Sequence, residues 1–218
     1  MEVAEQTPII AVLGVVVGLG LLTFLVITTT SFVKVAVVLF IVRNALGLQQ
    51  APPNIVLYGI ALSLTAFICA PLATEMSEAV LAGDPAFRSF DDYRAAFDRG
   101  VEPLRAFLIR LTAPESREFF LAASGELWPE DREQPFTDED LAVLIPAFLT
   151  AELQRAFEIG FLLYLPLVVV DLVVTSVLMA MGMTMVSPPI IATPVKLFLF
   201  VAISGWTRLL EGLVLSYA

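Results

Sequence analysis

The chain has 218 residues, of which 58% are hydrophobic and 16% are charged, and its formal net charge is −10. A soluble domain usually carries about 25% charged residues, so this composition favours a membrane protein. The sequence contains no histidine and a single cysteine, Cys69, which excludes Ser–His–Asp triads, Cys–His nucleophiles, Cys/His zinc sites and an internal disulfide. The acidic balance, without a Lys/Arg cluster, argues against a nucleic-acid partner.

Three uncharged apolar runs predict membrane-spanning helices. Ile9–Ile27 has 19 residues, Ile55–Thr74 has 20 and Leu172–Val195 has 24. A helix of roughly 20 apolar residues crosses the hydrocarbon core of a bilayer. The acidic start of the chain lacks the positive segment of a secretory signal peptide, so we expect the first run to be retained. The sequence therefore predicts an all-α membrane protein in contact with lipid.

The first of two expected long helical hairpins covers residues 1–74. Its turn runs from Arg43-Asn44 to Pro52-Pro53-Asn54, because successive prolines stop a helix. As a single helix, the apolar stretch 9–42 would be about 50 Å long, which is too long for one span. We therefore expect a bend or unwinding near Thr28–Ser31, or a helix that extends out of the bilayer.

The second expected hairpin covers residues 156–218, which brings the number of hydrophobic helices to about four. One helix is expected over 158–185 and the other over 190–215, with the turn at Ser187-Pro188-Pro189. Within the first of these helices, four methionines recur at every second position just before the turn.

A polar, acidic and mostly helical insert is expected between the hairpins, over residues 75–155. Apolar residues recur at helical spacing from Tyr93 to Leu111, which indicates an amphipathic helix. The segment 112–135 has little periodicity and is typical of a loop with short helical pieces. The sequence Thr137–Asp140 resembles a capping box that opens a helix near Asp138.

The distribution of basic residues predicts the orientation in the membrane. The region 31–54 carries Lys34 and Arg43 and no acidic residue, whereas the insert is rich in acidic residues. Cytoplasmic loops favour Lys and Arg. We therefore place Arg43 in the cytoplasm and both the N-terminus and the insert on the other side of the inner membrane, in the periplasm.

Four segments carry a resemblance to a known family. They are Val42–Asn54, Pro146–Phe161, Asp171–Pro188, and Pro194–Val201 followed by Gly205-Trp206. Together and in this order, they resemble the FliP/SctR family, the export-gate subunit that flagella and injectisomes share in type III secretion. The short N-terminus and the Val-Leu-Ser-Tyr ending resemble the injectisome branch, whose systems serve virulence.

The resemblance implies a non-enzymatic role in protein transport. Members of this family form a homopentamer that is joined by small hydrophobic subunits of the same export gate. The ring surrounds a channel in the inner membrane, through which unfolded secreted proteins pass. In such assemblies the hairpins can pack in a cone that is partly raised out of the bilayer.

The methionines before the second turn are the main candidate site, namely Met179, Met181, Met183 and Met185. Gly182 and the prolines indicate that the run leaves the helix and turns. The family resemblance identifies this segment as a methionine gasket that closes the resting pore. Thr184 stands where family members commonly carry another methionine, which implies a looser gasket. The alternative is an apolar turn in which flexible methionines fill gaps.

Three charges inside apolar runs form a second candidate site. Asp171 lies within the helix expected over 158–185, Lys34 within the apolar stretch 9–42, and Lys196 within the helix expected over 190–215. Because such charges are costly unless they are paired, we expect Asp171 to pair with Lys34 or Lys196 and so to fix helix register. The alternative function is a proton or ion relay that uses Asp171, with Glu158 nearby.

Glu152, Arg155 and Glu158 lie at positions i, i+3 and i+6 of one helix. They are expected to make exposed ion pairs or contacts between subunits. The alternative to an export gate is an ion or proton transporter subunit, or an intramembrane enzyme that uses Asp171. No GxSxG or P-loop sequence supports hydrolysis, and we expect no cofactor and no metal.

Overall fold

The computed structural model describes residues 2–82, 89–127 and 136–218, with side chains from Val12 onward. These residues contain no strand and form the helices α1 (Glu2–Thr29), α2 (Phe32–Ala45), α3 (Asn54–Leu81), α4 (Phe90–Leu111), α5 (Pro114–Leu127), α6 (Leu141–Ala180), α7 (Pro188–Ala202) and α8 (Gly205–Leu215). In the described part of the chain, α1, α3 and α6 are each long and apolar enough to span a membrane, and α7 with α8 forms a fourth, bent candidate. The prediction of an all-α membrane protein is confirmed.

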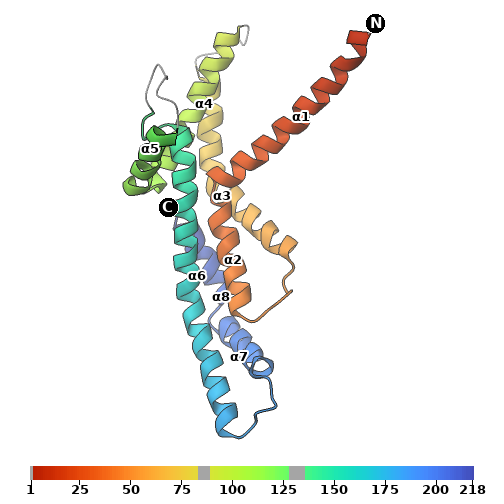
Figure 1. Cartoon of the computed structure of the whole chain (residues 1–218), viewed down its shortest axis with the longest axis vertical. Helices are drawn as coiled ribbons and strands as arrows, with labels where there is room; N and C mark the ends of the chain where they lie inside the picture. The colour runs from red at the N-terminus through yellow and green to blue at the C-terminus, as the bar shows by residue number, and fades with distance from the viewer. Residues whose placement is uncertain (1, 83–88, 128–135) are drawn as a thin grey trace.

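The break between α1 and α2 falls at Thr30-Ser31, which confirms the predicted interruption. Before the break, Thr28, Thr29 and Thr30 each donate a side-chain hydrogen bond to the carbonyl four residues earlier, at 2.9, 2.7 and 2.6 Å. Such bonds compete with the helix ladder and often bend a helix. As a result α1 projects away from the rest of the molecule (Figure 1). Its large apolar side chains from Val12 to Val26 are 43–62% exposed.

The core forms around α2, which lies against α3 and α6 (Figure 1). Its buried apolar side chains, Val35, Val38, Leu39 and Val42, pack with Leu57 and Ala61 of α3 and Ala156 of α6. A second apolar cluster packs α4 of the insert against α3 and α6. Leu108 of α4 and Leu144 and Phe148 of α6 are fully buried there. Helix α6 therefore belongs to both cores.

The insert is more regular than the sequence indicates. The predicted amphipathic helix is α4, which begins with a capping box between Ser89 and Asp92, with hydrogen bonds of 3.0 and 3.2 Å. The expectation of a loop with short helical pieces over 112–135 is wrong for Pro114–Leu127, which is the continuous helix α5. Proline at the first helical position is preorganised for this start. Residues 128–135 lie outside the described part of the chain.

Two expected boundaries of the insert fall inside continuous helices. Helix α3 continues past residue 75 to Leu81, and α6 already begins at Leu141, before residue 155. The helix expected to open near Asp138 begins three residues later, at Leu141, because the Asp140 carboxylate accepts the backbone N–H of Thr137 at 2.7 Å and holds a turn before the helix. With 40 residues, α6 is about 60 Å long, roughly twice the thickness of the hydrocarbon core.

The expected single helix over 190–215 is also wrong. It is divided into α7 and α8, whose axes differ by 61°. Ser204, between them, has a positive φ of 55°, which a continuing helix does not permit. The rings of Phe200 and Trp206 meet edge to face across this break, with centroids 5.3 Å apart. After the break, Leu209 and Leu213 of α8 pack into the core around α2.

Candidate functional site

The methionine-rich segment forms the connection between α6 and α7. Helix α6 ends at Ala180, and Gly182 has a φ of +73°. The Gly182 N–H donates to the Met179 carbonyl at 3.0 Å, and the Met183 N–H donates to the Leu178 carbonyl at 2.9 Å. These two bonds form a Schellman motif, which stops a helix at a glycine in the left-handed region. The predicted exit from the helix at Gly182 is confirmed.

The four methionine side chains of this connection are exposed. The exposed fractions are 69% for Met179, 67% for Met181, 41% for Met183 and 98% for Met185. The connection lies at the far end of the α6–α7 hairpin from α4 and α5 (Figure 1). The turn therefore presents flexible thioether side chains outward at one end of the molecule instead of burying them as core residues.

Asp171 and Lys196 join the two arms of this hairpin. The Lys196 Nζ lies 2.5 Å from the Asp171 Oδ2 and also donates a hydrogen bond of 3.0 Å to the Ala45 carbonyl. The Lys196 side chain is 6% exposed and that of Asp171 is 43% exposed. Of the two partners considered for Asp171, the structure thus places Lys196 beside it. Lys34 lies elsewhere.

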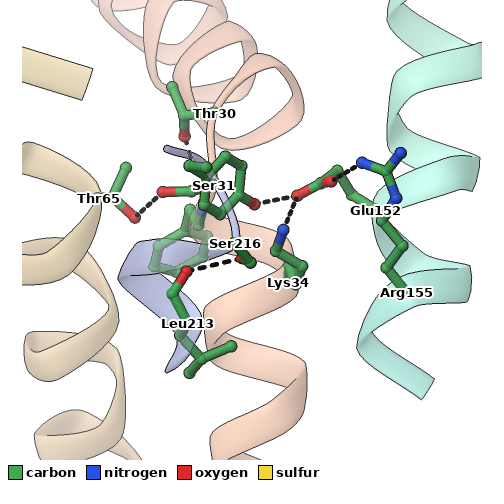
Figure 2. A network of polar contacts seen from close by, with 10 residues as sticks. Thr30, Ser31, Lys34, Thr65, Glu152, Arg155, Leu213 and Ser216 are labelled. Atoms are coloured by element: carbon green, nitrogen blue, oxygen red, sulfur yellow. Dashed lines mark hydrogen bonds and ion pairs between the residues drawn. The ribbon is translucent and has the colours of Figure 1, made fainter. Parts of the chain in front are cut away.

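Lys34 is at the centre of a separate buried cluster (Figure 2). Its Nζ lies 3.4 Å from the Glu152 Oε2, and the two side chains are 1% and 0% exposed. The Tyr217 hydroxyl donates to the same carboxylate oxygen, and the Lys34 Nζ lies 3.5 Å from the centroid of the Tyr217 ring. The Glu152 Oε1 accepts a bond of 3.3 Å from Arg155. The carboxylate therefore connects α2, α6 and the segment after α8.

Burial and the neighbouring Glu152 carboxylate raise the pKa of the Tyr217 phenol. The hydroxyl consequently stays protonated and keeps its role as a donor to Glu152. Ser31 extends the polar contacts on the other side of the cluster, since its hydroxyl donates to Thr65 Oγ1 at 3.3 Å, at the break between α1 and α2 (Figure 2).

The expectation of an exposed Glu152 is wrong, because its carboxylate is enclosed by partners from the same chain. Arg155 is 40% exposed, and Glu158 is exposed, with a bond of 3.3 Å from Gln154. The residues one helical turn before and after Glu152 indicate that this side chain is buried. The neighbours of Glu152 at i−4 and i+4, Phe148 and Ala156, are both fully buried. Tyr217 has no comparable signal in the sequence.

The chain as a whole matches a known protein family. The model of the FliP family matches residues 15–213 of the chain. The chain belongs to the FliP family. Within the part of the chain that the structure describes, no group of three His, Cys, Asp or Glu residues is placed to hold a metal ion.

Relatives of this FliP-family chain cover almost its whole length. It is 55% identical to the "Probable translocation protein y4yL" of Sinorhizobium fredii, over 97% of this chain and 96% of that protein. It is 42% identical to the "Yop proteins translocation protein R" of Yersinia pestis, over 100% and 99% of the two chains. It is 40% identical to the "Virulence protein YscR" of Salmonella typhimurium, over 94% and 95%. The resemblance to the FliP/SctR family is confirmed, and these names agree with the injectisome branch.

Replacement of Asp171 by asparagine should leave the FliP-family chain folded. The Asp171 side chain is 43% exposed in the subunit, and Asp171→Asn retains the Lys196 bond to Ala45, whereas Lys196→Met loses both interactions. In detergent, the heat-induced unfolding midpoint should therefore fall less for Asp171→Asn than for Lys196→Met. A fully stable Asp171→Asn variant that loses proton transport would instead favour the relay.

Proposed function

We propose that this protein is a pore-forming core subunit of a type III secretion export apparatus, of the injectisome type. It conducts unfolded protein substrates across the bacterial inner membrane. The observation that carries the proposal is the exposed methionine turn of a FliP-family chain, held at the end of a hairpin. Relatives that are named for translocation and virulence support it.

The functional unit in this proposal is a homopentamer with small hydrophobic subunits of the same apparatus. Exposed apolar surface supports an assembly, because α1 and large parts of α6 and α7 present leucine, valine and phenylalanine outward. Lipid or neighbouring subunits must cover such a surface. Since α6 is longer than the bilayer is thick, lipid alone cannot cover its whole length.

The candidate residues then take separate roles. Met179, Met181, Met183 and Met185 of each subunit contribute to a gasket around the channel axis, where flexible thioethers adapt to a passing chain. Asp171 and Lys196 hold the two arms of the hairpin together. Lys34 and Glu152 fix the register of α2 against α6. Of the charged residues Glu152, Arg155 and Glu158, the last two remain available to a neighbouring subunit, since Arg155 is 40% exposed and Glu158 is exposed.

Native mass measurement tests this proposal. The chain, expressed in a bacterial inner membrane together with the small hydrophobic subunits of its apparatus and purified in mild detergent, should migrate as a large stable complex that contains five copies. A strain that lacks the subunit should regain secretion when the chain is supplied. A monomer that transports ions and restores no secretion would favour the transporter alternative.

The proposed orientation places the N-terminus and the acidic insert in the periplasm. In this arrangement, the loop that follows α2 and contains Gln49 is cytoplasmic. In a Cys69→Ala background, Asp98→Cys should react with a membrane-impermeant maleimide in cells with a permeable outer membrane. Gln49→Cys should react only after the inner membrane is opened. The reverse pattern would contradict the orientation.

A further inference from the structure

The end of α2 meets α7 in an unusually close contact. Helix α2 ends in a second Schellman motif, in which Gly47 donates to the Asn44 carbonyl at 3.0 Å and Leu48 donates to the Arg43 carbonyl at 3.2 Å. Gly47 has a φ of +78°. A Cβ atom at this position would lie 2.7 Å from the Oγ1 of Thr193 on α7. The motif therefore requires glycine for its backbone and for its contact with α7.

A second interaction joins the same two elements. The Lys196 Nζ, one helical turn beyond Thr193, donates to the Ala45 carbonyl at 3.0 Å. The last carbonyls of a helix lack partners within the helix, so a lysine from another element stabilises this end. The two elements also share the walls of a hollow of about 600 Å³, to which the segment after α2 contributes Gly47 and Gln49 and α7 contributes Pro188 and Pro189.

Helix α7 carries one side of the methionine turn. It begins at Pro188, directly after the turn, and Thr193 lies five residues later, about 7.5 Å along the helix. On the other side of the turn, α6 is held to α7 through Asp171 and Lys196. A shift of α7 at Thr193 would therefore displace the turn itself, because helices transmit such shifts as rigid elements.

We propose that the C-terminal end of α2 is the seat on which α7 rests, and that Gly47 is a positioning residue for the methionine turn. This inference rests on the proposed closure of the channel by the turn. Gly47 lies against Thr193 of α7 and is not itself part of the turn. It acts by allowing Thr193 to approach the end of α2 closely. This approach sets the position of α7 against α2, and so the position of Met183 and Met185 at the channel axis.

The test compares Gly47→Ala with a matched control in the complete assembly. Gly59→Ala is the control, because a Cβ at Gly59 meets nothing within 4 Å. The first readout is ion and small-solute leak in cells. The second is hydrogen exchange of backbone amides over residues 188–200 in the purified complex, which follows α7 independently of conduction. Gly47→Ala should increase the leak to that of the Met183→Gly/Met185→Gly variant and accelerate exchange in α7, whereas Gly59→Ala should change neither.

Rescue separates the contact from the backbone conformation. Thr193→Ala removes the atom nearest to the added Cβ, so Gly47→Ala/Thr193→Ala should recover most of the closure and protection that Gly47→Ala loses. A double variant as leaky as the single one would overturn the seat, because strain at residue 47 alone would then explain the effect. Should Gly47→Ala fail to assemble, Thr193→Leu enlarges the contact from α7 and should reproduce both changes.

The two readouts also distinguish this inference from the proposed function. Accelerated exchange in α7 without leak, together with a tight Met183→Gly/Met185→Gly variant, would support the seat and contradict the gasket. Unchanged exchange and no leak in Gly47→Ala, while the methionine variant leaks, would overturn the positioning role of Gly47 and leave the gasket in place.

Discussion

Replacement of Met183 and Met185 by glycine should raise the ion and small-solute leak of the resting assembly several-fold. The two side chains project from the turn, and Met185 is 98% exposed in the subunit. If one turn from each subunit meets at the axis, removing both thioether side chains from every subunit opens a gap that water and ions enter. The measurement is ion conductance and solute leak across cells that express the complete gate, with assembly verified by native mass.

Size-matched substitution provides the control for this experiment. Met183→Leu/Met185→Leu retains apolar bulk but loses the flexibility of the unbranched thioether. This variant should stay closed at rest and export more slowly, because a stiffer side chain adapts less to a passing substrate. A Met183→Gly/Met185→Gly assembly without increased leak would show that the methionines serve packing. Asp171 would then be the candidate functional residue.

Glu152→Gln should strongly destabilise the assembly. The substitution leaves the Lys34 ammonium buried without a negative partner, at 1% exposure. Removal of one member of a buried ion pair costs about 3–5 kcal/mol, because the remaining charge stays desolvated. The midpoint for heat-induced unfolding in detergent should drop strongly, and the amount of complex in the membrane should fall with it.

Glu118→Gln is the control for Glu152→Gln, since it makes the same chemical change at an exposed helical position. It should shift the midpoint very little. Removal of both buried charges in Lys34→Met/Glu152→Gln should restore much of the stability, because no isolated charge then remains. If Glu152→Gln proves as stable as Glu118→Gln, the buried pair does not hold α2 against α6.

Local sequence signals predicted most elements of this fold, but they did not predict α5, the break before α8, or how the elements meet. The apolar runs, the bend at Thr28–Ser31 and the helix stop at Gly182 follow from composition and from short-range backbone preferences. The break before α8 depends on a left-handed Ser204 and on the packing of Phe200 against Trp206. Neither has a signature in neighbouring residues.

The candidate sites divide in the same way. The methionine turn is one continuous stretch of the chain, so all of its residues can be recognised in the sequence. The pairing of Lys34 with Glu152 joins residues that are distant in the sequence, and Tyr217 completes it from beyond α8. One sequence shows that a lysine in an apolar run needs a partner. It does not show which acidic residue the fold will bring there.

The pairing of Lys34 with Glu152 also has a consequence for biosynthesis. Lys34 precedes Glu152 by 118 residues, from 152 − 34. At synthesis rates of about 5–20 residues per second, roughly 6–24 s pass before the partner of Lys34 has even been translated. During that interval a lone ammonium in an apolar environment is costly, so we expect α2 to stay near water until α6 has been made. The packing of α2 against α6 through this pair can be completed only after Glu152 has been translated.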